Sequence, residues 1–481
     1  MSRRITIGPF NRVEGDLEVR LDIADGVVIS AEVTAPLYRG FEQILQGRAA
    51  LDALTLVPRI CGICSVSQSI AAVAALRAVD GIVAAPNGVL AANLAHAAEN
   101  AADHLTHFYL FFMPDFAREA YAARKWHPEI VARFKAVHGS AAQQALPARA
   151  RLLQIMGLLA GKWPHSLAFQ PGGTTRAIDL GERVQLLSVI ADFRVFLETT
   201  LFADKLDNVL ALDSVDALQR WRDGRGGDFA RFLALADDLD LGAQGRLALP
   251  LMSVGAYHGA GRPLFAAGVF DPSSAKLHGF DPASITEDVA HAWMRDTSRR
   301  PAEAETSPDA DKVAGYSWCK APRLDGRPAE VGALARQAVD GDPLIRDLLK
   351  QGGPSVKTRV IARLIETARL AAAMQNWARQ FDLQKPFLDR IVRRGEGAGI
   401  GLVEAARGSL GHWIELFDDK IRRYQIIAPT TWNFSPRDRD GVAGPLEQAL
   451  VGTQVGDEGA ASVAVQHVVR SFDPCMVCTA H

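Results

Sequence analysis

The sequence predicts an α+β protein that is predominantly α, with a central bundle of long helices and a small N-terminal antiparallel β portion. Apolar residues recur at helical spacing in three segments, which begin near residues 94, 186 and 360. The first 35 residues alternate instead between apolar and polar positions, a pattern typical of strands with one buried face. A turn-rich stretch with short strand-like runs separates the second and third helical segments and predicts an α+β excursion.

Each element follows from a local signal. The stretch LEVRLDIADGVVISAEVTA at 17–35 contains two alternating runs around Ala-Asp-Gly, so we expect a hairpin there. The run YSWCKAPRL at 316–324 predicts a short strand within the excursion. The single unit of residues 1–481 is then expected to comprise a β hairpin region at about 1–35, a helical core at about 86–213 and 355–385, an α+β excursion at about 214–330 and a metal-ligand segment at 472–481.

Composition excludes several classes of protein. The 53 Lys and Arg residues balance 55 Asp and Glu residues, which gives no reason to expect nucleic acid as a partner. The amino terminus lacks the apolar segment of a secretory signal, and no apolar run is long enough to cross a bilayer. We therefore expect a cytoplasmic protein without a membrane span.

A glycine-rich run, GEGAGIG at 395–401, resembles a dinucleotide-binding loop at first sight. Its glycines fail the G-x-G-x-x-G spacing in every register, because the last position falls on Ile400, Leu402 or Glu404. The run therefore does not predict a dinucleotide site.

The five cysteines give the strongest chemical signal. Cys61 and Cys64 form one C-x-x-C pair, and Cys475 and Cys478 form another near the opposite end of the chain. Four thiolates suit one zinc, iron or nickel site, and a structural zinc site is the simplest interpretation of two such pairs. A thioredoxin-like redox pair is a second alternative for the first motif, but no βαβ pattern surrounds it.

RICGIC at 59–64 and DPCMVCTAH at 473–481 resemble the two cysteine motifs of nickel-iron hydrogenase large subunits. Other segments that resemble the family are RVEG at 12–15, RGFE at 39–42, HFY at 107–109, PGG at 171–173, YSWCKAPR at 316–323, EVGALAR at 330–336, EAARG at 404–408 and YQIIAPTTWNFSPRD at 424–438. Most of these are weak alone, but their joint order along the whole chain is very specific.

The resemblance implies a nickel-iron centre that splits dihydrogen into a hydride and a proton. It implies that Cys61 and Cys475 are terminal ligands of nickel, whereas Cys64 and Cys478 bridge nickel and iron. In the family the iron also carries cyanide and carbon monoxide. Soft sulfur donors suit this chemistry.

The resemblance also implies roles for residues around the metals. Arg407 matches an arginine that lies over the metal pair, and Asp103 and Asp473 match the acids beside it. A guanidinium next to two carboxyl groups predicts that both stay charged at neutral pH. Glu14 matches a glutamate that passes protons away from a bridging cysteine, although without the family a solvated strand residue is the simpler interpretation.

Two further groups of residues follow from the same resemblance. Thr430 matches a hydroxyl that bonds a cyanide, with Pro429 setting the loop. Glu42, the backbone carbonyl of Ile426 and the terminal His481 match the ligands of a buried ion, usually magnesium.

Certain positions depart from the commonest pattern and indicate a branch of the family. Gln68 stands four residues after Cys64, where most members have His, and it resembles the branch that senses hydrogen for gene regulation. Ile63 and Phe111 are bulkier than the Val and Leu common at these positions. We expect them to narrow the gas route and to exclude dioxygen more than dihydrogen.

Electron transfer requires a partner. Cys319 is the one cysteine left over, and an iron-sulfur cluster normally takes four ligands. We therefore expect an obligate small subunit that carries the iron-sulfur clusters and, in the sensing branch, a histidine kinase. The rival functions are an energy-conserving uptake hydrogenase, a structural zinc protein and a quinone-binding relative of the same fold.

Overall fold

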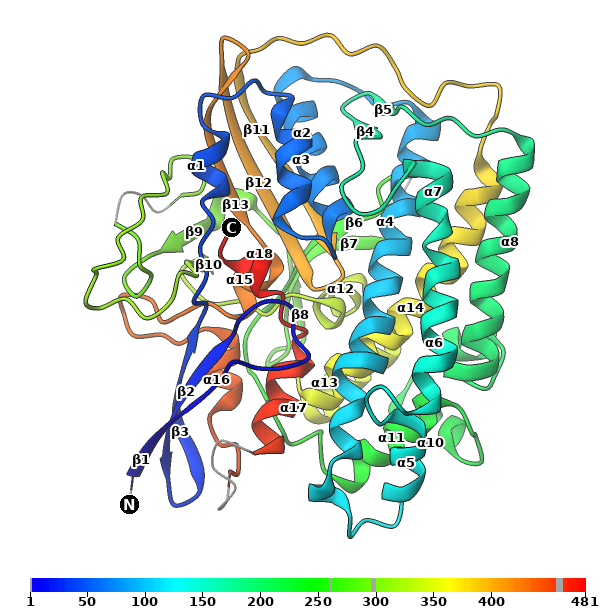
Figure 1. Ribbon diagram of the computed structural model, residues 1–481, viewed down its shortest axis with the longest axis vertical. Helices are drawn as coiled ribbons and strands as arrows, with labels where there is room; N and C mark the ends of the chain where they lie inside the picture. The colour runs from blue at the N-terminus through cyan, green and yellow to red at the C-terminus, as the bar shows by residue number, and fades with distance from the viewer. Residues whose placement is uncertain (1, 260–261, 296–299, 456–461) are drawn as a thin grey trace.

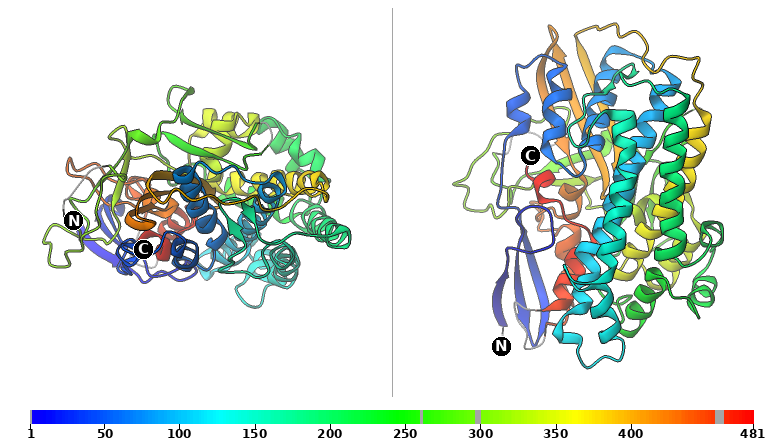
Figure 2. Two further views of the ribbon diagram at one scale, coloured as in Figure 1. Left: turned by 90° about the horizontal axis from the view of Figure 1, so that it is seen from above. Right: turned by 45° about the vertical axis from the view of Figure 1, so that its right-hand side comes forward.

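The computed structural model describes residues 2–259, 262–295, 300–455 and 462–481, and it has the mixed α+β architecture predicted. In Figure 1 the long helices α4, α6, α8 and α14 stand together on one side of the molecule, and the sheets lie on the other. Figure 2 shows the same division from a second direction.

The amino-terminal region is a three-stranded antiparallel sheet, one strand more than the predicted hairpin. It consists of β1 (Ser2–Ile7), β2 (Glu18–Ala24) and β3 (Val27–Thr34) in that order. The β2–β3 turn places Asp25 and Gly26 at φ of 50° and 78°, as a type I′ hairpin turn requires. The longer β1–β2 connection carries Glu14 toward the centre of the molecule.

The three helices predicted from periodicity are present and longer than the patterns themselves. They are α4 (Pro86–Thr106), α8 (Leu180–Phe196) and α14 (Val356–Gln380). Capping boxes begin α8 at Asp179 and α14 at Ser355, which satisfies backbone N–H groups that a helix start leaves unpaired. Helix α14 packs against both α4 and α8.

Shorter elements complete the chain. The other helices of the first half are α1 (Phe41–Leu45), α2 (Asp52–Leu56), α3 (Ser65–Asp80), α5 (His127–Phe134), α6 (Ser140–Leu152), α7 (Gln154–Ala160), α9 (Leu206–Leu210), α10 (Val215–Arg222) and α11 (Asp228–Asp238). Those of the second half are α12 (Ala333–Asp340), α13 (Pro343–Gly352), α15 (Pro429–Asn433), α16 (Pro445–Leu450), α17 (Val463–Ser471) and α18 (Met476–Thr479).

The region of the predicted excursion contains helices α10 and α11 and two small sheets. One sheet is β6 (Leu251–Ala256), β7 (Phe265–Asp271) and β8 (Lys276–His278), and the other pairs β9 (Ile285–Asp288) with β10 (Ala321–Leu324). Strand β10 lies within YSWCKAPRL, as the sequence predicts. Residues 260–261 and 296–299 of this region lie outside the described residues. A two-residue hairpin, β4 (Phe169–Gln170) and β5 (Gly173–Thr174), precedes α8.

Another sheet follows the glycine-rich run and was not predicted. It consists of β11 (Gly397–Ala405), β12 (Gly408–Phe417) and β13 (Lys420–Ile427). Gly399 and Gly401 lie on the face of β11 that meets helix α3. A Cβ atom at Gly401 would lie 1.9 Å from the carbonyl oxygen of Ala71. The glycines therefore serve close helix–sheet packing, which explains their spacing without a nucleotide.

This close approach predicts that Gly401→Ala destabilises the fold. The new methyl group would force α3 away from β11, and overpacking of a core costs ~1–3 kcal/mol or more. Gly157→Ala is the matched control, because Gly157 lies in α7 and a Cβ atom added there would meet nothing within 4 Å. Thermal unfolding followed by circular dichroism should show a lower apparent Tm for the first variant only; equal Tm values would contradict the packing account.

The carboxyl-terminal segment runs through the interior. Helix α17 leads to Asp473–His481, in which every residue except the partly exposed Val477 is buried. Figure 1 shows the chain end in the middle of the molecule, beside α18. No helix among the described residues is long and apolar enough to span a bilayer.

Candidate metal centre

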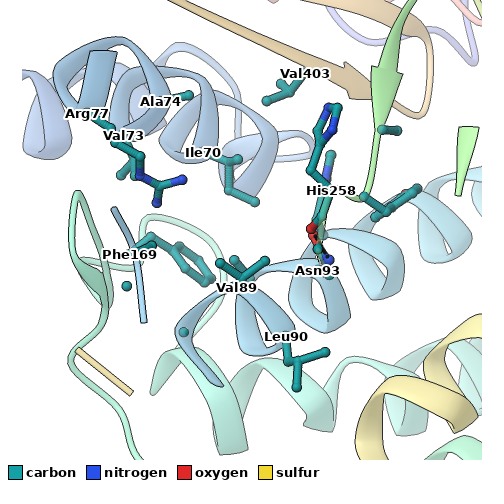
Figure 3. Close-up of a pocket in the computed structure, with 18 of the residues that line it drawn as sticks. Ile70, Val73, Ala74, Arg77, Val89, Leu90, Asn93, Phe169, His258 and Val403 are labelled. Carbon is teal, nitrogen blue, oxygen red and sulfur yellow. Dashed lines mark hydrogen bonds between the residues drawn. The ribbon is translucent and has the colours of Figure 1, made fainter. Parts of the chain in front are cut away.

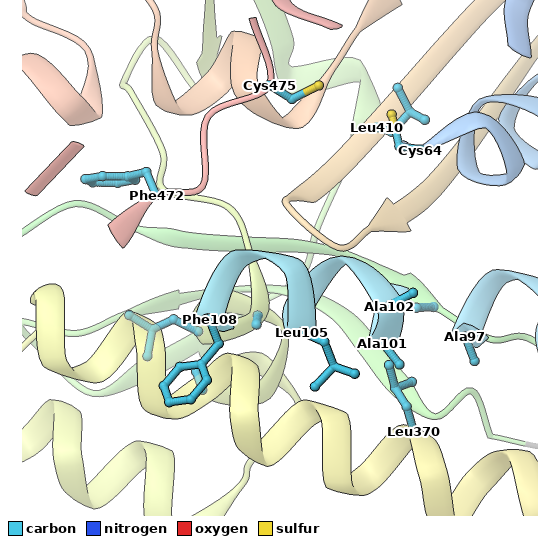
Figure 4. Packing of buried hydrophobic residues seen from close by; sticks show 14 of the residues in the cluster. Cys64, Ala97, Ala101, Ala102, Leu105, Phe108, Leu370, Leu410, Phe472 and Cys475 are labelled. Carbon is cyan, nitrogen blue, oxygen red and sulfur yellow. The ribbon is translucent and has the colours of Figure 1, made fainter. Parts of the chain in front are cut away.

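The structure brings both cysteine pairs together at the starts of α3 and α18. Cys61 follows a 3₁₀ turn and Cys64 immediately precedes α3, while Cys475 immediately precedes α18 and Cys478 lies within it. All four side chains are buried. Figure 4 shows Cys64 and Cys475 on facing segments above α4. The chain thus joins residues 414 positions apart, as the sequence predicted.

The sulfur atoms are close enough to share metal ions. Sγ of Cys61 lies 3.5 Å from that of Cys475, and Sγ of Cys478 lies 3.2 Å from those of Cys64 and Cys475. Hydrogen bonds with Cys475 lower the pKa of Cys61 well below its usual range and raise the pKa values of Cys64 and Cys478 well above theirs. Metal ions would have to displace the thiol protons to bind four buried sulfur atoms at this spacing, and soft sulfur donors fit nickel and iron.

Backbone contacts hold the two motifs in register. The N–H of Glu14 donates to the carbonyl of Pro474 at 3.3 Å, and the N–H of Met476 donates to the carbonyl of Glu14 at 2.7 Å. The Arg39 guanidinium donates to the carbonyl of Ile60 at 2.6 Å and also to that of Val477. Arg39 therefore joins the segments that carry the two pairs of cysteines.

Arg407 lies buried between the two predicted acids. Its Nε donates to the backbone carbonyl of Asp473 at 2.9 Å, and its Nη2 donates to Asp103 at 3.1 Å and Asp473 at 3.2 Å. Nη1 approaches Asp103 Oδ2 to 2.7 Å without forming an aligned hydrogen bond. One N–H of a fixed guanidinium is therefore available to an acceptor at the metal pair.

The pKa values of the two acids shift in opposite directions. Burial opposes ionisation of Asp473, but Arg407 lowers the pKa of this carboxyl below its usual value. Burial raises the pKa of Asp103 to about 8 despite the attraction of Arg407, and the nearby Asp473 carboxylate adds to the increase. The single charge of Arg407 thus offsets the effect of burial at Asp473 and not at Asp103.

Thr430 and Glu14 both contact the segment that carries Cys475. Pro429 begins α15, and the Thr430 hydroxyl accepts a hydrogen bond from the N–H of Cys475 at 3.2 Å, which leaves its own proton for another acceptor. Glu14 is partly exposed, and burial together with the charge of Cys61 raises the pKa of its carboxyl group. It therefore stands between the cysteines and solvent with a raised proton affinity.

A second polar cluster surrounds the chain end. His481 Nδ1 lies 2.8 Å from the carbonyl of Cys478 and must donate to it, so Nε2 presents its lone pair to Glu42 Oε1 at 3.3 Å unless it is protonated. The N–H of Ile426, rather than its carbonyl, contacts Glu42, at 2.8 Å. Lys320 and His481 overcome the effect of burial and lower the pKa of Glu42 to about 2.

Lys320 was not predicted at this cluster. Its ammonium lies 3.2 Å from Glu42, 3.3 Å from Glu287 and 2.9 Å from Gln425. Burial, together with the charge of Glu42, raises the pKa of Glu287 despite the attraction of Lys320, and Glu287 Oε1 has no hydrogen-bond partner among the described residues. The donor set therefore fits an additional cation. The only sequence signal was the position of Lys320 inside YSWCKAPR.

Arg336 is a second residue that was missed. It is completely buried, pairs with Glu366 and Glu404, and donates to the carbonyls of Ala405 and Ala406 at 2.8 and 3.0 Å. These contacts fix the two residues before Arg407. Its position in EVGALAR was the only signal.

The contacts of the remaining predicted residues, Gln68, Ile63 and Phe111, do not define a role for them. Gln68 is completely buried in the first turns of α3, and its Oε1 lies 2.9 Å from Nε2 of His412. Ile63 is partly buried beside the cysteines in sequence. Phe111 lines a cavity of about 280 Å³ with Arg12 and Phe134, and none of the four cysteines lines this cavity.

A larger cavity, of about 720 Å³, lies between α3 and α4 (Figure 3). It is lined mainly by apolar side chains such as Ile70, Val73, Val89 and Phe169. None of the predicted site residues lines it, so cavity size would not have located the buried cysteines.

Comparisons with known proteins agree with this geometry. The family described as nickel-dependent hydrogenase matches residues 39–143 and 140–481. The large subunit of the periplasmic [NiFeSe] hydrogenase of Desulfomicrobium baculatum is 28% identical over 99% of this chain and 95% of its own length. The hydrogenase-2 large chain of Escherichia coli K12 is 27% identical over 100% of this chain and 97% of its own.

Solved structures show the same fold. The Ni-Fe-Se hydrogenase of D. vulgaris Hildenborough superposes with a TM-score of 0.87 at 28% identity, with all of both chains covered. The family match and the buried cluster of four cysteines favour the nickel-iron interpretation over a structural zinc or redox pair. The chain belongs to the nickel-dependent hydrogenase family, as a large subunit.

Proposed function

We propose that this subunit holds a nickel-iron centre, with cyanide and carbon monoxide on iron, at Cys61, Cys64, Cys475 and Cys478. The observation that carries the proposal is a single buried cluster of four sulfur atoms beside an available N–H of Arg407. The metal pair supplies the soft Lewis-acid site at which dihydrogen is split into hydride and proton. Metal analysis should find nickel, and infrared spectra should show metal-bound cyanide and carbonyl bands; zinc alone refutes the proposal.

In this proposal, side chains of the subunit donate hydrogen bonds at the metal pair and transfer the proton that is released from dihydrogen. Arg407, oriented by Asp103 and Asp473, donates a hydrogen bond at the metal pair, and Thr430 offers a hydroxyl proton nearby. Burial opposes the charge of Arg407, but Asp103 and Asp473 raise the pKa of its guanidinium, so Arg407 stays protonated and a cysteine thiolate would receive the released proton. Glu14 would carry this proton toward solvent, because its carboxyl group is partly exposed.

The second cluster is proposed as a magnesium site. Glu42, His481 and the backbone of Ile426 surround it, and the lowered pKa of Glu42 together with the unpartnered Oε1 of Glu287 in the described part of the chain supports a cation there. An ion at His481 would fix the end of the chain and thereby Cys478.

Residues 1–481 would act as one unit around a central helical bundle.

Hydrogen sensing is the proposed biological role. Gln68 in place of the common histidine supports it. The subunit would pair with an iron-sulfur small subunit and signal through a histidine kinase in the cytoplasm, so that hydrogenase genes respond to hydrogen.

An uptake hydrogenase is the second candidate, and the relatives favour it. One of them is the uptake hydrogenase large subunit of Rubrivivax gelatinosus, 25% identical over 100% of this chain and 95% of its own length. Deletion of the gene separates the two roles. A sensor predicts that other hydrogenase genes no longer respond to hydrogen, whereas an uptake enzyme predicts an intact response and lost hydrogen-dependent growth.

Oxygen tolerance is proposed to depend on Ile63 and Phe111. Smaller side chains in the Ile63→Val, Phe111→Leu double variant should widen the gas route, so that activity after exposure to air falls several-fold relative to the wild type. Residual activity measured before and after a timed oxygen pulse tests this. Equal tolerance in the two proteins would refute it.

A further inference from the structure

A buried hydrogen-bond chain leads from β13 through β12 to the start of α3. The Tyr424 hydroxyl lies 2.8 Å from His412 Nδ1, and His412 Nε2 lies 2.9 Å from Gln68 Oε1. All three side chains are completely buried, so water does not compete for these bonds. No role for His412 or Tyr424 followed from the sequence.

The donors and acceptors in this chain have one consistent arrangement. A glutamine carbonyl oxygen only accepts, so His412 Nε2 must carry the hydrogen. Burial lowers the pKa of His412 to about 3, so the neutral ring has a bare Nδ1 that accepts the Tyr424 O–H. The flipped amide would leave the Tyr424 proton without an acceptor in the described part of the chain.

The arrangement leaves one donor of Gln68 free. Its Nε2 is buried and has no hydrogen-bond partner among the described residues. Gln68 lies one helical turn after Cys64, with its backbone N–H bonded to the Cys64 carbonyl at 3.0 Å. Side chains four residues apart lie on the same side of a helix. A buried N–H without an acceptor costs about 1–3 kcal/mol, so an acceptor on this side is expected.

We propose that His412 and Tyr424 are positioning residues that hold the Gln68 amide with its N–H toward the thiolate of Cys64. The inference rests on the nickel-iron pair proposed above, because metal binding makes that sulfur a thiolate and a strong acceptor. A flipped amide would instead turn its carbonyl oxygen toward a negative sulfur. Tyr424 and His412 thus determine whether the N–H group or the carbonyl oxygen of the Gln68 amide faces the metal centre.

The hydrogen bond has a measurable electronic effect. It withdraws electron density from the bridging sulfur and hence from iron, which weakens back-donation into carbon monoxide and raises the carbonyl stretching frequency. Loss of the bond therefore lowers that frequency. Substitution of a residue that merely supports packing would not shift the carbonyl stretching frequency in a fixed direction.

Infrared spectra of the purified holoenzyme, with its small subunit, test the proposal. Gln68→Leu, His412→Leu and Tyr424→Phe should all shift the carbonyl band to lower frequency, with the largest shift for Gln68→Leu. His412→Gln retains an N–H donor to Gln68 and should keep the band closer to the wild-type position. Tyr316→Phe is the matched control, since it removes another buried hydroxyl, the one that bonds Glu447.

Two results would overturn the inference while the cofactor proposal stands. One is an unchanged carbonyl band in Tyr424→Phe, the variant least able to disturb folding. The other is an equal shift in Tyr316→Phe. A wild-type enzyme without metal-bound carbonyl or cyanide bands would refute the cofactor proposal itself, and this inference with it.

Discussion

Cys475→Ser is expected to abolish both nickel binding and hydrogenase activity. The Cys475 sulfur lies within 3.5 Å of Cys61 and within 3.2 Å of Cys478, so it contributes directly to the shared donor set. A serine hydroxyl does not ionise near neutral pH and is a hard donor, which disfavours nickel. Nickel analysis of the purified complex and hydrogen-dependent dye reduction should both fall to background.

Cys319→Ser is the matched control for this result. Cys319 is equally buried, but its thiol donates to the carbonyl of Lys320 at 3.1 Å and is not part of the sulfur cluster. Wild-type nickel content in Cys319→Ser with none in Cys475→Ser supports the assignment. Retained nickel in Cys475→Ser would contradict it.

Glu14→Gln should reduce turnover by ~10²–10⁴-fold, the usual effect of removing a proton-transfer group. The backbone contacts of Glu14 with Pro474 and Met476 do not involve the carboxyl group, so the substitution should leave the metal centre assembled. The reason for the loss is that an amide does not accept and release the proton. Steady-state hydrogen oxidation, compared with nickel content on the same sample, measures the effect.

Glu32→Gln provides the comparison for Glu14→Gln. Glu32 lies on β3 of the same amino-terminal sheet and forms a surface ion pair with Arg20, 3.8 Å away. Its substitution should change turnover little, because exposed ion pairs contribute little. Normal turnover in Glu14→Gln would remove Glu14 from the proton route.

The sequence predicted the cysteine cluster better than its surroundings. Two C-x-x-C motifs single out the four cysteines that the structure brings together, and the resemblance to a family added their expected roles. The sheet around Gly399 and Gly401 was missed because glycine at alternate positions erases the apolar alternation of a strand. Helix α3 was missed because residues on nearly all of its sides are buried, which removes the amphipathic period.

The partners of buried charged residues were also not predicted from the sequence. Lys320 and Arg336 meet their carboxylates across long sequence separations, so no local pattern marks them. The raised pKa of Asp103 depends on complete burial beside a second acid. The long-range ion pairs and the pKa shift of Asp103 arise only after tertiary packing, and local sequence patterns therefore do not predict them.

The buried carboxyl-terminal segment has a consequence for how the set of sulfur donors is completed. The contacts of Asp473–His481 with Glu14 and Arg39 hold two of the four cysteines in place. Without this segment, Cys61 and Cys64 alone would make up half a ligand set. The segment that completes the set of sulfur donors is therefore also a segment that is itself buried, and metal binding should stabilise its position.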